Sequence, residues 1–145
     1  MNKKEKLIKQ FYKKLNNKIY NLSINDIAES LNIIILETYG QSRIIQDEFE
    51  DYIIILNKDL HSCQKRKIFF HELAHYFLKH LDTYDTLTNY DYKYMEKEAD
   101  SIGLLLAIPP HELKNFDLND SDIIIKLYDL YNLPLQSIEE RLQIY

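Results

Sequence analysis

The sequence has 145 residues, 46% of them hydrophobic, and a formal net charge of −5. This length and composition predict a globular domain with a buried core and exclude a disordered chain. No glycine-rich nucleotide-binding pattern is present, and the single cysteine excludes an internal disulfide framework and favours a reducing compartment, the cytoplasm. No stretch has the length and apolarity of a membrane span, so we expect no membrane partner.

The first segment is strongly basic. Residues 1–18 contain seven lysines and one glutamate, a net charge of +6, which leaves −11 for the rest of the chain. Because an acidic body repels nucleic acid, we expect no direct nucleic-acid binding and interpret the lysines as a solvated helix face. Contact of this arm with DNA or with an acidic partner is the alternative. Apolar residues at helical spacing predict an amphipathic helix over residues 4–20, namely Leu7, Ile8, Phe11, Leu15 and Ile19.

Short β-branched and aromatic runs follow this helix. Ser23, with Asp26 three residues later, predicts a capped helix that ends at Leu31. Three runs then predict a small three-stranded meander, namely Ile33–Glu37, Arg43–Gln46 and Tyr52–Leu56. The last strand is either an edge to which an extended peptide could add or a strand buried between two neighbours. The sequence does not separate these two alternatives.

The helix predicted over Lys65–His80 contains the motif His71-Glu72-Leu73-Ala74-His75. Four residues advance a helix by about 400°, so the two histidines lie on one face, one turn apart. Glu72 lies beside them, about 100° from His71. This is the spacing of two histidines that bind Zn²⁺ and a glutamate that activates a water molecule. Two surface histidines and a solvated glutamate are the alternative. We expect Ser62 to cap this helix, and its buried face to contain Ile68, Phe69, Leu73 and Phe77.

A catalytic zinc site needs a third protein ligand. His80 lies nine residues after His71, about 900° along the helix, so we expect it on the opposite face, as a solvated residue of the last turn. The next predicted helix offers Glu96 as the third ligand. Asp100 shares the face of Glu96 and is predicted to accept the outer N–H of a ligand histidine. Glu98 lies about 200° from Glu96 and ranks second as a ligand, and a solvated charged face is the alternative.

The rest of the chain is predicted to be mainly helical. A loop is expected over residues 81–90, followed by helices over Tyr92–Ala107, over Pro110–Lys114, from Asp120 or Ser121 to Tyr131, and from Pro134 onward. The predicted fold class is therefore α+β, with a small three-stranded sheet packed on the motif helix and a helical C-terminal half. We expect a single domain, in which residues 1–20 form the basic helix, 21–110 the zinc-peptidase core and 111–145 the C-terminal helices.

Together these segments resemble the ImmA/IrrE family of small zinc metallopeptidases, within the broader gluzincin-like group. The resemblance covers residues 24–142 in layout and residues 50–110 in specific motif. It implies an α+β peptidase core and a cytoplasmic protease that acts on a helix-turn-helix repressor, often encoded beside it on a phage or integrative element. Ala107-Ile108 stands where the family often has Leu-Met. The resemblance is carried by His71-Glu72-Leu73-Ala74-His75, Glu96-Lys97-Glu98-Ala99-Asp100 and Leu104-Leu105-Leu106-Ala107-Ile108-Pro109.

The predicted function is thus a zinc-dependent endopeptidase that cleaves a helix-turn-helix repressor or antitoxin. The rival is a non-proteolytic zinc-containing module that binds such a protein and sequesters it. The sequence does not separate Zn²⁺ from another metal such as Mn²⁺. A further hydrogen-bond donor would stabilise the oxyanion of the transition state. Four side chains are candidates for this donor, and none is chosen: Tyr90, Tyr92, Tyr94 and His111.

Overall fold

The computed structural model describes residues 2–81 and 89–144. Its helices are α1 (Lys3–Tyr12), α2 (Ile24–Ser30), α3 (Ser62–Phe77), α4 (Asn89–Ala107), α5 (Pro110–Leu113), α6 (Ile123–Tyr131) and α7 (Leu135–Leu142), with a 3-10 turn η1 at Ile19–Asn21. Its strands are β1 (Ile33–Thr38), β2 (Arg43–Gln46) and β3 (Tyr52–Asn57). These elements confirm the predicted α+β class.

The sheet has the order β1-β3-β2, so the predicted meander is wrong. β1 pairs with β3 in parallel and β2 pairs with β3 in antiparallel orientation. In a meander the central strand would be β2, whose end residues Arg43 and Gln46 are exposed and polar. The apolar run of β3 suits the centre better, where the strand is paired at both edges, and Ile54 and Leu56 are fully buried. β3 is therefore the strand paired on both sides, and β2 lies at an edge.

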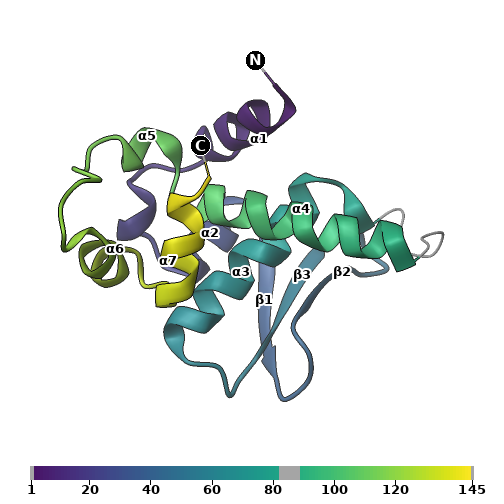
Figure 1. Cartoon of the computed structure of the whole chain (residues 1–145). Coiled ribbons are helices and arrows are strands. Elements are labelled where there is room, and N and C mark those ends of the chain that lie inside the picture. The colour runs from purple at the N-terminus through teal and green to yellow at the C-terminus, as the bar shows by residue number, and fades with distance from the viewer. Residues whose placement is uncertain (1, 82–88, 145) are drawn as a thin grey trace.

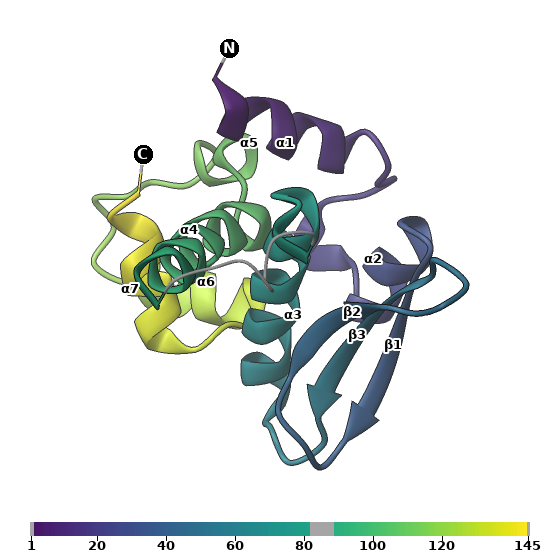
Figure 2. The same ribbon diagram turned by 90° about the vertical axis from the view of Figure 1, so that its right-hand side faces the viewer.

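Helix α3 lies between the sheet and the C-terminal helices (Figure 2). Phe69, Leu73 and Phe77 on its predicted inner face are buried, whereas Ile68 is half-buried. Figure 1 shows α4 running across α3, with α5, α6 and α7 gathered near the C-terminal end of α4. One cluster of buried side chains runs from Ile8 in α1 to Ile138 in α7. None of the described helices is long and apolar enough to cross a bilayer.

Two helices end earlier than their sequence periodicity predicts. Helix α1 stops at Tyr12 rather than at residue 20, and Ile19 reaches the core from η1 instead. Helix α3 stops at Phe77 rather than at His80, because Lys79 adopts a left-handed conformation with φ of 59°. The predicted loop over residues 81–90 lies largely outside the described residues.

Of the predicted helix caps, Ser23 is confirmed, whereas those of α3 and α6 are wrong, since Asp122 rather than Asp120 or Ser121 precedes α6. Ser23 and Asp26 form the predicted capping box, with two hydrogen bonds of 3.0 Å between each side chain and the other's backbone N–H. Helix α3 begins at Ser62 itself, so the prediction that Ser62 is the cap is wrong by one residue, and His61 takes that position. The Ser62 hydroxyl instead accepts a hydrogen bond from the Asn132 amide at 2.8 Å.

A buried polar cluster joins the N-terminal segment to the C-terminal helices. The Glu112 carboxylate, 1% exposed, accepts hydrogen bonds from the Ile19 N–H at 2.9 Å and from the Tyr131 hydroxyl at 2.8 Å. The Arg66 guanidinium donates to the carbonyls of Ile19 and Leu22, both at 2.7 Å. These contacts hold the backbone of η1 in place, so the segment around Ile19 does not continue the α-helix of α1.

Candidate metal centre

The two motif histidines and Glu96 converge between α3 and α4. The distance from Nε2 of His71 to Nε2 of His75 is 3.1 Å. The Glu96 carboxylate lies across both rings, with Oε2 at 2.9 Å from Nε2 of His71 and Oε1 at 3.1 Å from Nε2 of His75. The structure therefore brings these three side chains together as one group that could hold a metal ion.

This arrangement fits a tetrahedral zinc ion. Zinc binds histidine nitrogens and carboxylate oxygens at about 2.0–2.1 Å, which places neighbouring ligand atoms about 3.3 Å apart. The three distances between the ligand atoms, 2.9 to 3.1 Å, are close to that edge length. Two ring nitrogens and a carboxylate that face one another at such distances repel through their lone pairs unless a proton or a cation lies among them. The donor set is thus suited to a shared divalent cation.

Glu72 is a buried carboxyl group beside this site. Glu72 is 8% exposed, and its carboxylate lies within hydrogen-bond reach of the backbone of Ile44 on β2. The pKa of Glu72 is raised to about 7, mainly by burial and also by the Glu96 charge, against the opposing effects of His71 and the Ile44 backbone. A carboxyl group with a pKa near the working pH is suited to take up and release a proton.

The raised pKa of Glu72 predicts a pH-dependent gain in stability for the metal-free Glu72→Gln variant. As pH rises from the ordinary pKa of 4.5 to about 7, the unfolded chain loses this proton first, so ionisation disfavours the folded state. Above that window the neutral glutamine side chain of the variant avoids this cost, and we expect a gain of about 1–3 kcal/mol over the wild type. At about pH 5 we expect little difference, since Glu72 remains protonated in the fold.

Urea denaturation of both metal-free proteins at about pH 5 and about pH 8 measures this difference. The comparison between variants is needed because the lowered pKa of His75 acts in the opposite direction on the wild-type curve, where stability falls as the pH drops below 6.5. A stability difference between the two proteins that does not change with pH would contradict the assignment.

Asp100 lies on the far side of the His71 ring. Its Oδ1 is 2.8 Å from Nδ1 of His71, although off the line of a straight N–H hydrogen bond. Burial alone would lower the pKa of His71, but Asp100, Glu72 and Glu96 together raise it. The same contact lowers the pKa of Asp100. The structure thus places Asp100 at the outer nitrogen of a candidate ligand, which is the position expected for it.

His80 is buried, and the prediction that it is a solvated residue of the last turn is wrong. Its Nδ1 lies 2.8 Å from Nδ1 of His75, and its Nε2 lies 3.0 Å from Oε1 of Glu98. The angular argument failed because α3 ends at Phe77, and the left-handed turn at Lys79 brings the next residue back beneath His75. No glycine or asparagine marks this turn, so the sequence carries no signal of the helix end. The Glu98 carboxylate contacts His80 and is not part of the group formed by His71, His75 and Glu96.

The surroundings of His75 keep its ring neutral. Burial, and then the neighbouring His71 and His80, lower the pKa of His75 to about 3. The residue is only 2% exposed. A neutral imidazole has a lone pair for a metal ion, so little competition from protons is expected at His75 near neutral pH.

The four candidate oxyanion donors are separated by the structure. Tyr92 lies one turn before Glu96 on α4, and the charge of Glu96, then burial and the charge of Glu72, raise its pKa. Tyr94 is 61% exposed, and the His111 ring packs edge-on against Tyr12 at 4.6 Å on the α5 side of the molecule. The side chain of Tyr90 lies outside the described residues. Of the described candidates, Tyr92 is thus the one whose pKa the charges of Glu96 and Glu72 raise, and the residue is itself 48% exposed.

Gly103 lets α4 approach α3 closely at the site. A Cβ atom at this position would lie 3.1 Å from the carbonyl oxygen of Phe70 and 3.2 Å from the backbone N and Cα of His71. These are helix backbone atoms, which yield less easily than a side chain. Gly103 thus sets the separation between the helix that carries the histidines and the helix that carries Glu96.

We expect Gly103→Ala to destabilise the protein and to weaken metal binding. Alanine in an exposed helix stabilises relative to glycine by roughly 0.5–1 kcal/mol, whereas overpacking costs about 1–3 kcal/mol. We expect the cost of overpacking to exceed the gain in helix propensity. The resulting shift of α4 should raise the zinc dissociation constant about tenfold. Thermal unfolding and chelator competition measure the two effects. Gly40→Ala is the matched control, because a Cβ atom there would meet only the Thr38 side chain, at 3.8 Å. Equal effects of the two substitutions would contradict this role of Gly103.

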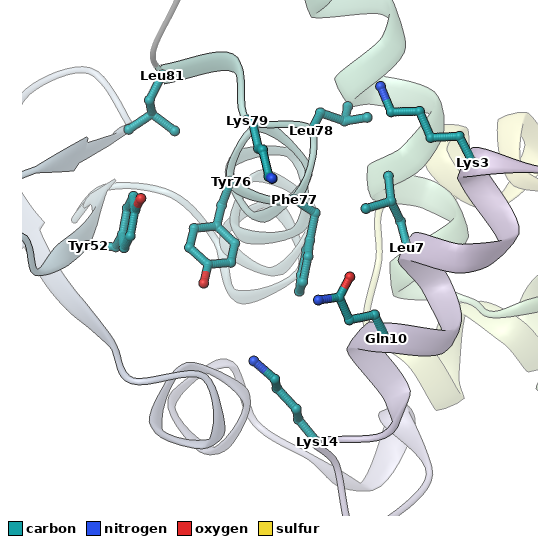
Figure 3. A pocket seen from close by; sticks show the side chains of 10 residues that line it. All are labelled: Lys3, Leu7, Gln10, Lys14, Tyr52, Tyr76, Phe77, Leu78, Lys79 and Leu81. Atoms are coloured by element: carbon teal, nitrogen blue, oxygen red, sulfur yellow. The ribbon is translucent and has the colours of Figure 1, made fainter.

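A cavity lined by residues of α1, β3 and α3 lies away from the candidate metal centre. It has a volume of about 560 Å³ between α1 and the C-terminal end of α3, where Tyr52, Tyr76 and three lysines point into it (Figure 3). None of the described residues that line it is a histidine, cysteine or acidic residue. A smaller cavity of about 130 Å³ touches the site itself at His71 and Asp100. Cavity volume therefore does not identify the candidate metal centre, because the candidate ligand atoms lie too close to one another to enclose a large cavity.

Comparison with known proteins gives one family. The model of a peptidase family described as the IrrE N-terminal-like domain matches residues 28–143. The match includes both motif histidines, Glu72 and the whole of α4. A search of curated proteins finds no match.

Proposed function

We propose that this chain, which belongs to the family of IrrE N-terminal-like peptidases, is a zinc-dependent endopeptidase. The observation that carries the proposal is the convergence of His71, His75 and Glu96 around one centre, with a buried glutamate beside them. Surface histidines and a solvated glutamate, the alternative for the motif, do not account for this burial. His75 is 2% exposed and Glu72 is 8% exposed.

In the proposed mechanism His71, His75 and Glu96 hold the ion, and Glu72 is the general base and acid. A bound zinc ion would polarise the scissile carbonyl and lower the pKa of water from 15.7 to about 7. Glu72 accepts a proton as the water oxygen bonds to the carbonyl carbon. It then delivers that proton to the amine nitrogen as the C–N bond breaks. Asp100 orients the His71 ring through its outer nitrogen, which fixes the ring for ligation. Tyr92 is the proposed oxyanion donor, on the basis of its coupling to Glu96 and Glu72.

We propose that the substrate is an extended stretch of a protein chain that pairs with β2. An edge strand offers unpaired backbone groups to an extended peptide. β2 is an edge strand that contacts α3, and the backbone of Ile44 on this strand lies within reach of Glu72. A peptide on this edge would therefore pass close to the general base.

The proposed substrate protein is a helix-turn-helix repressor or antitoxin of a phage or mobile element. This part of the proposal rests on the family resemblance, not on a feature of the site. The cytoplasm is the proposed location, since the one cysteine, Cys63, is free and unpaired by any disulfide in the described structure.

Metal removal and restoration test the proposed activity. The purified protein is incubated with candidate helix-turn-helix repressors, and mass spectrometry identifies the products. We expect one or a few cleavage sites, loss of cleavage after treatment with a zinc chelator, and recovery with a single equivalent of Zn²⁺. Restoration by Mn²⁺ alone would assign a different metal. Cleavage that persists without metal would contradict the proposal.

The sequestering module remains the second candidate. It requires that repressor function be lost while the repressor stays intact. Gel-shift release of the repressor from its DNA, measured on the same samples, separates the two candidates. Release without new peptide products would favour sequestration over hydrolysis.

A further inference from the structure

We propose that His80 and Glu98 are positioning residues that fix the proton of His75 and thereby direct its inner nitrogen to the metal. The inference rests on the proposed role of His75 as a ligand and extends it to two residues outside the motif. It starts from a continuous row of contacts, from Glu98 on α4 through His80 to His75 on α3.

The direction of the hydrogen bonds in this row follows from the chemistry of each group. A histidine that binds a metal through Nε2 as a neutral ring carries its proton on Nδ1. That proton points at Nδ1 of His80, 2.8 Å away, which must then be an acceptor. A neutral His80 that accepts at Nδ1 carries its own proton on Nε2, and this N–H faces Oε1 of Glu98 at 3.0 Å. An ionised carboxylate can only accept a hydrogen bond. Each nitrogen and oxygen atom in the row can therefore be assigned as a donor or as an acceptor in a single consistent way.

Because it is buried, this row restricts the orientation of the His75 ring more than Asp100 restricts that of the His71 ring. His80 is 6% exposed and His75 is 2% exposed, so water competes little for their hydrogen bonds. Asp100, which supports His71, has a side chain that is 61% exposed. Its contact with His71 is also off the line of the ring N–H. We therefore expect His75 to be the more rigidly oriented of the two candidate ligands.

The row also joins three separate parts of the chain. His75 lies in the last turns of α3, His80 follows the left-handed turn at Lys79, and Glu98 lies on α4 two residues from Glu96. A movement of α4 relative to α3 would thus displace the third ligand and the support of His75 together. The metal site is in this way coupled to the packing of the two helices.

Heteronuclear NMR of the zinc-loaded protein tests the proton positions directly. We expect His80 to be neutral with its proton on Nε2, and the Nδ1 proton of His75 to exchange slowly with solvent. In the Glu98→Leu variant we expect faster exchange of the His75 proton, because His80 loses the acceptor that fixes its own proton. A proton on Nδ1 of His80 in the wild type would overturn the inference.

Zinc affinity, measured by chelator competition, tests the consequence for the metal. We expect His80→Phe to raise the zinc dissociation constant about 10- to 100-fold, the range typical of lost support for a ligand. His80→Gln keeps an acceptor for the His75 proton, so it should remain within about threefold of the wild type. Glu98→Gln should likewise bind more tightly than Glu98→Leu. Glu139→Leu, which removes an exposed carboxylate on α7, is the matched control with no expected change.

The outcomes separate this inference from the proposed function. If His80→Phe and Glu98→Leu bind zinc as tightly as the wild type, the inference is wrong and the peptidase proposal stands. If the His80→Gln variant is as weak as His80→Phe, the effect is one of packing rather than of hydrogen bonding, which also overturns the inference. A wild-type protein that binds no divalent metal would overturn both.

Discussion

Replacement of Glu72 by glutamine is expected to lower the rate of peptide cleavage by about 10² to 10⁴ while the protein keeps its zinc. Glutamine has nearly the shape of the buried carboxyl group but cannot accept and release the proton that hydrolysis moves. The three candidate ligands are other residues, so the metal content should remain at one equivalent. This combination of lost activity and retained metal distinguishes a catalytic group from a metal ligand, whose loss would also lower the zinc content.

The measurement is a cleavage rate at saturating zinc together with the zinc content of the same preparation. Glu139→Gln is a suitable control, because it makes the same chemical change at an exposed position on α7. The Glu72→Gln variant also separates the two candidate functions. If this substitution leaves repressor inactivation unchanged, the chain acts by binding, and the peptidase mechanism is wrong.

Replacement of Glu112 by leucine is expected to destabilise the protein by about 3–5 kcal/mol. The buried carboxylate accepts hydrogen bonds from the Ile19 N–H and the Tyr131 hydroxyl. Hydrogen bonds to a charged group contribute about 1.5–3 kcal/mol each, and a buried donor left without a partner costs about 1–3 kcal/mol. Leucine removes both acceptor contacts at a residue that is 1% exposed. The loss should release the η1 segment from the C-terminal helices.

Urea denaturation in one defined metal state measures this effect. Glu112→Gln is the informative companion, because the amide oxygen can accept from Ile19 while the Tyr131 hydroxyl turns to accept from the amide nitrogen. We expect a smaller loss there, below about 2 kcal/mol. Glu139→Leu should change stability by less than about 0.5 kcal/mol. A Glu112→Leu protein within about 1 kcal/mol of the wild type would contradict the proposed role of this cluster.

Features that depend on spacing within one element could be predicted from the sequence. The positions of His71 and His75 on one helical face follow from a separation of four residues, and those of Glu96 and Asp100 follow in the same way. The structure brings His71, His75 and Glu96 within 4.8 Å of one another. The capping box at Ser23 and the α+β class were also predictable, since both follow from residues close together in the chain.

Features that depend on how elements pack against one another could not be predicted. The order of the strands depends on which strand pairs at both edges, and in the structure this strand is β3, between β1 and β2. The 3-10 turn at Ile19 depends on a carboxylate more than ninety positions away, that of Glu112. The close approach of α4 depends on Gly103, which looks like an ordinary helix residue in the sequence.

The metal centre combines both kinds of information. The sequence by itself predicted the histidine pair on one helical face, the candidate general base beside it and the acidic residues on the next helix, because a helix repeats its direction every 3.6 residues. Only the tertiary structure decided where His80 lies, buried between His75 and Glu98. A left-handed residue at position 79 ends the periodicity on which the sequence argument relied, and packing of α4 then supplies Glu98 as the partner. The direction of a side chain can be calculated from helical periodicity only within the helix, and not for residues that follow its last turn.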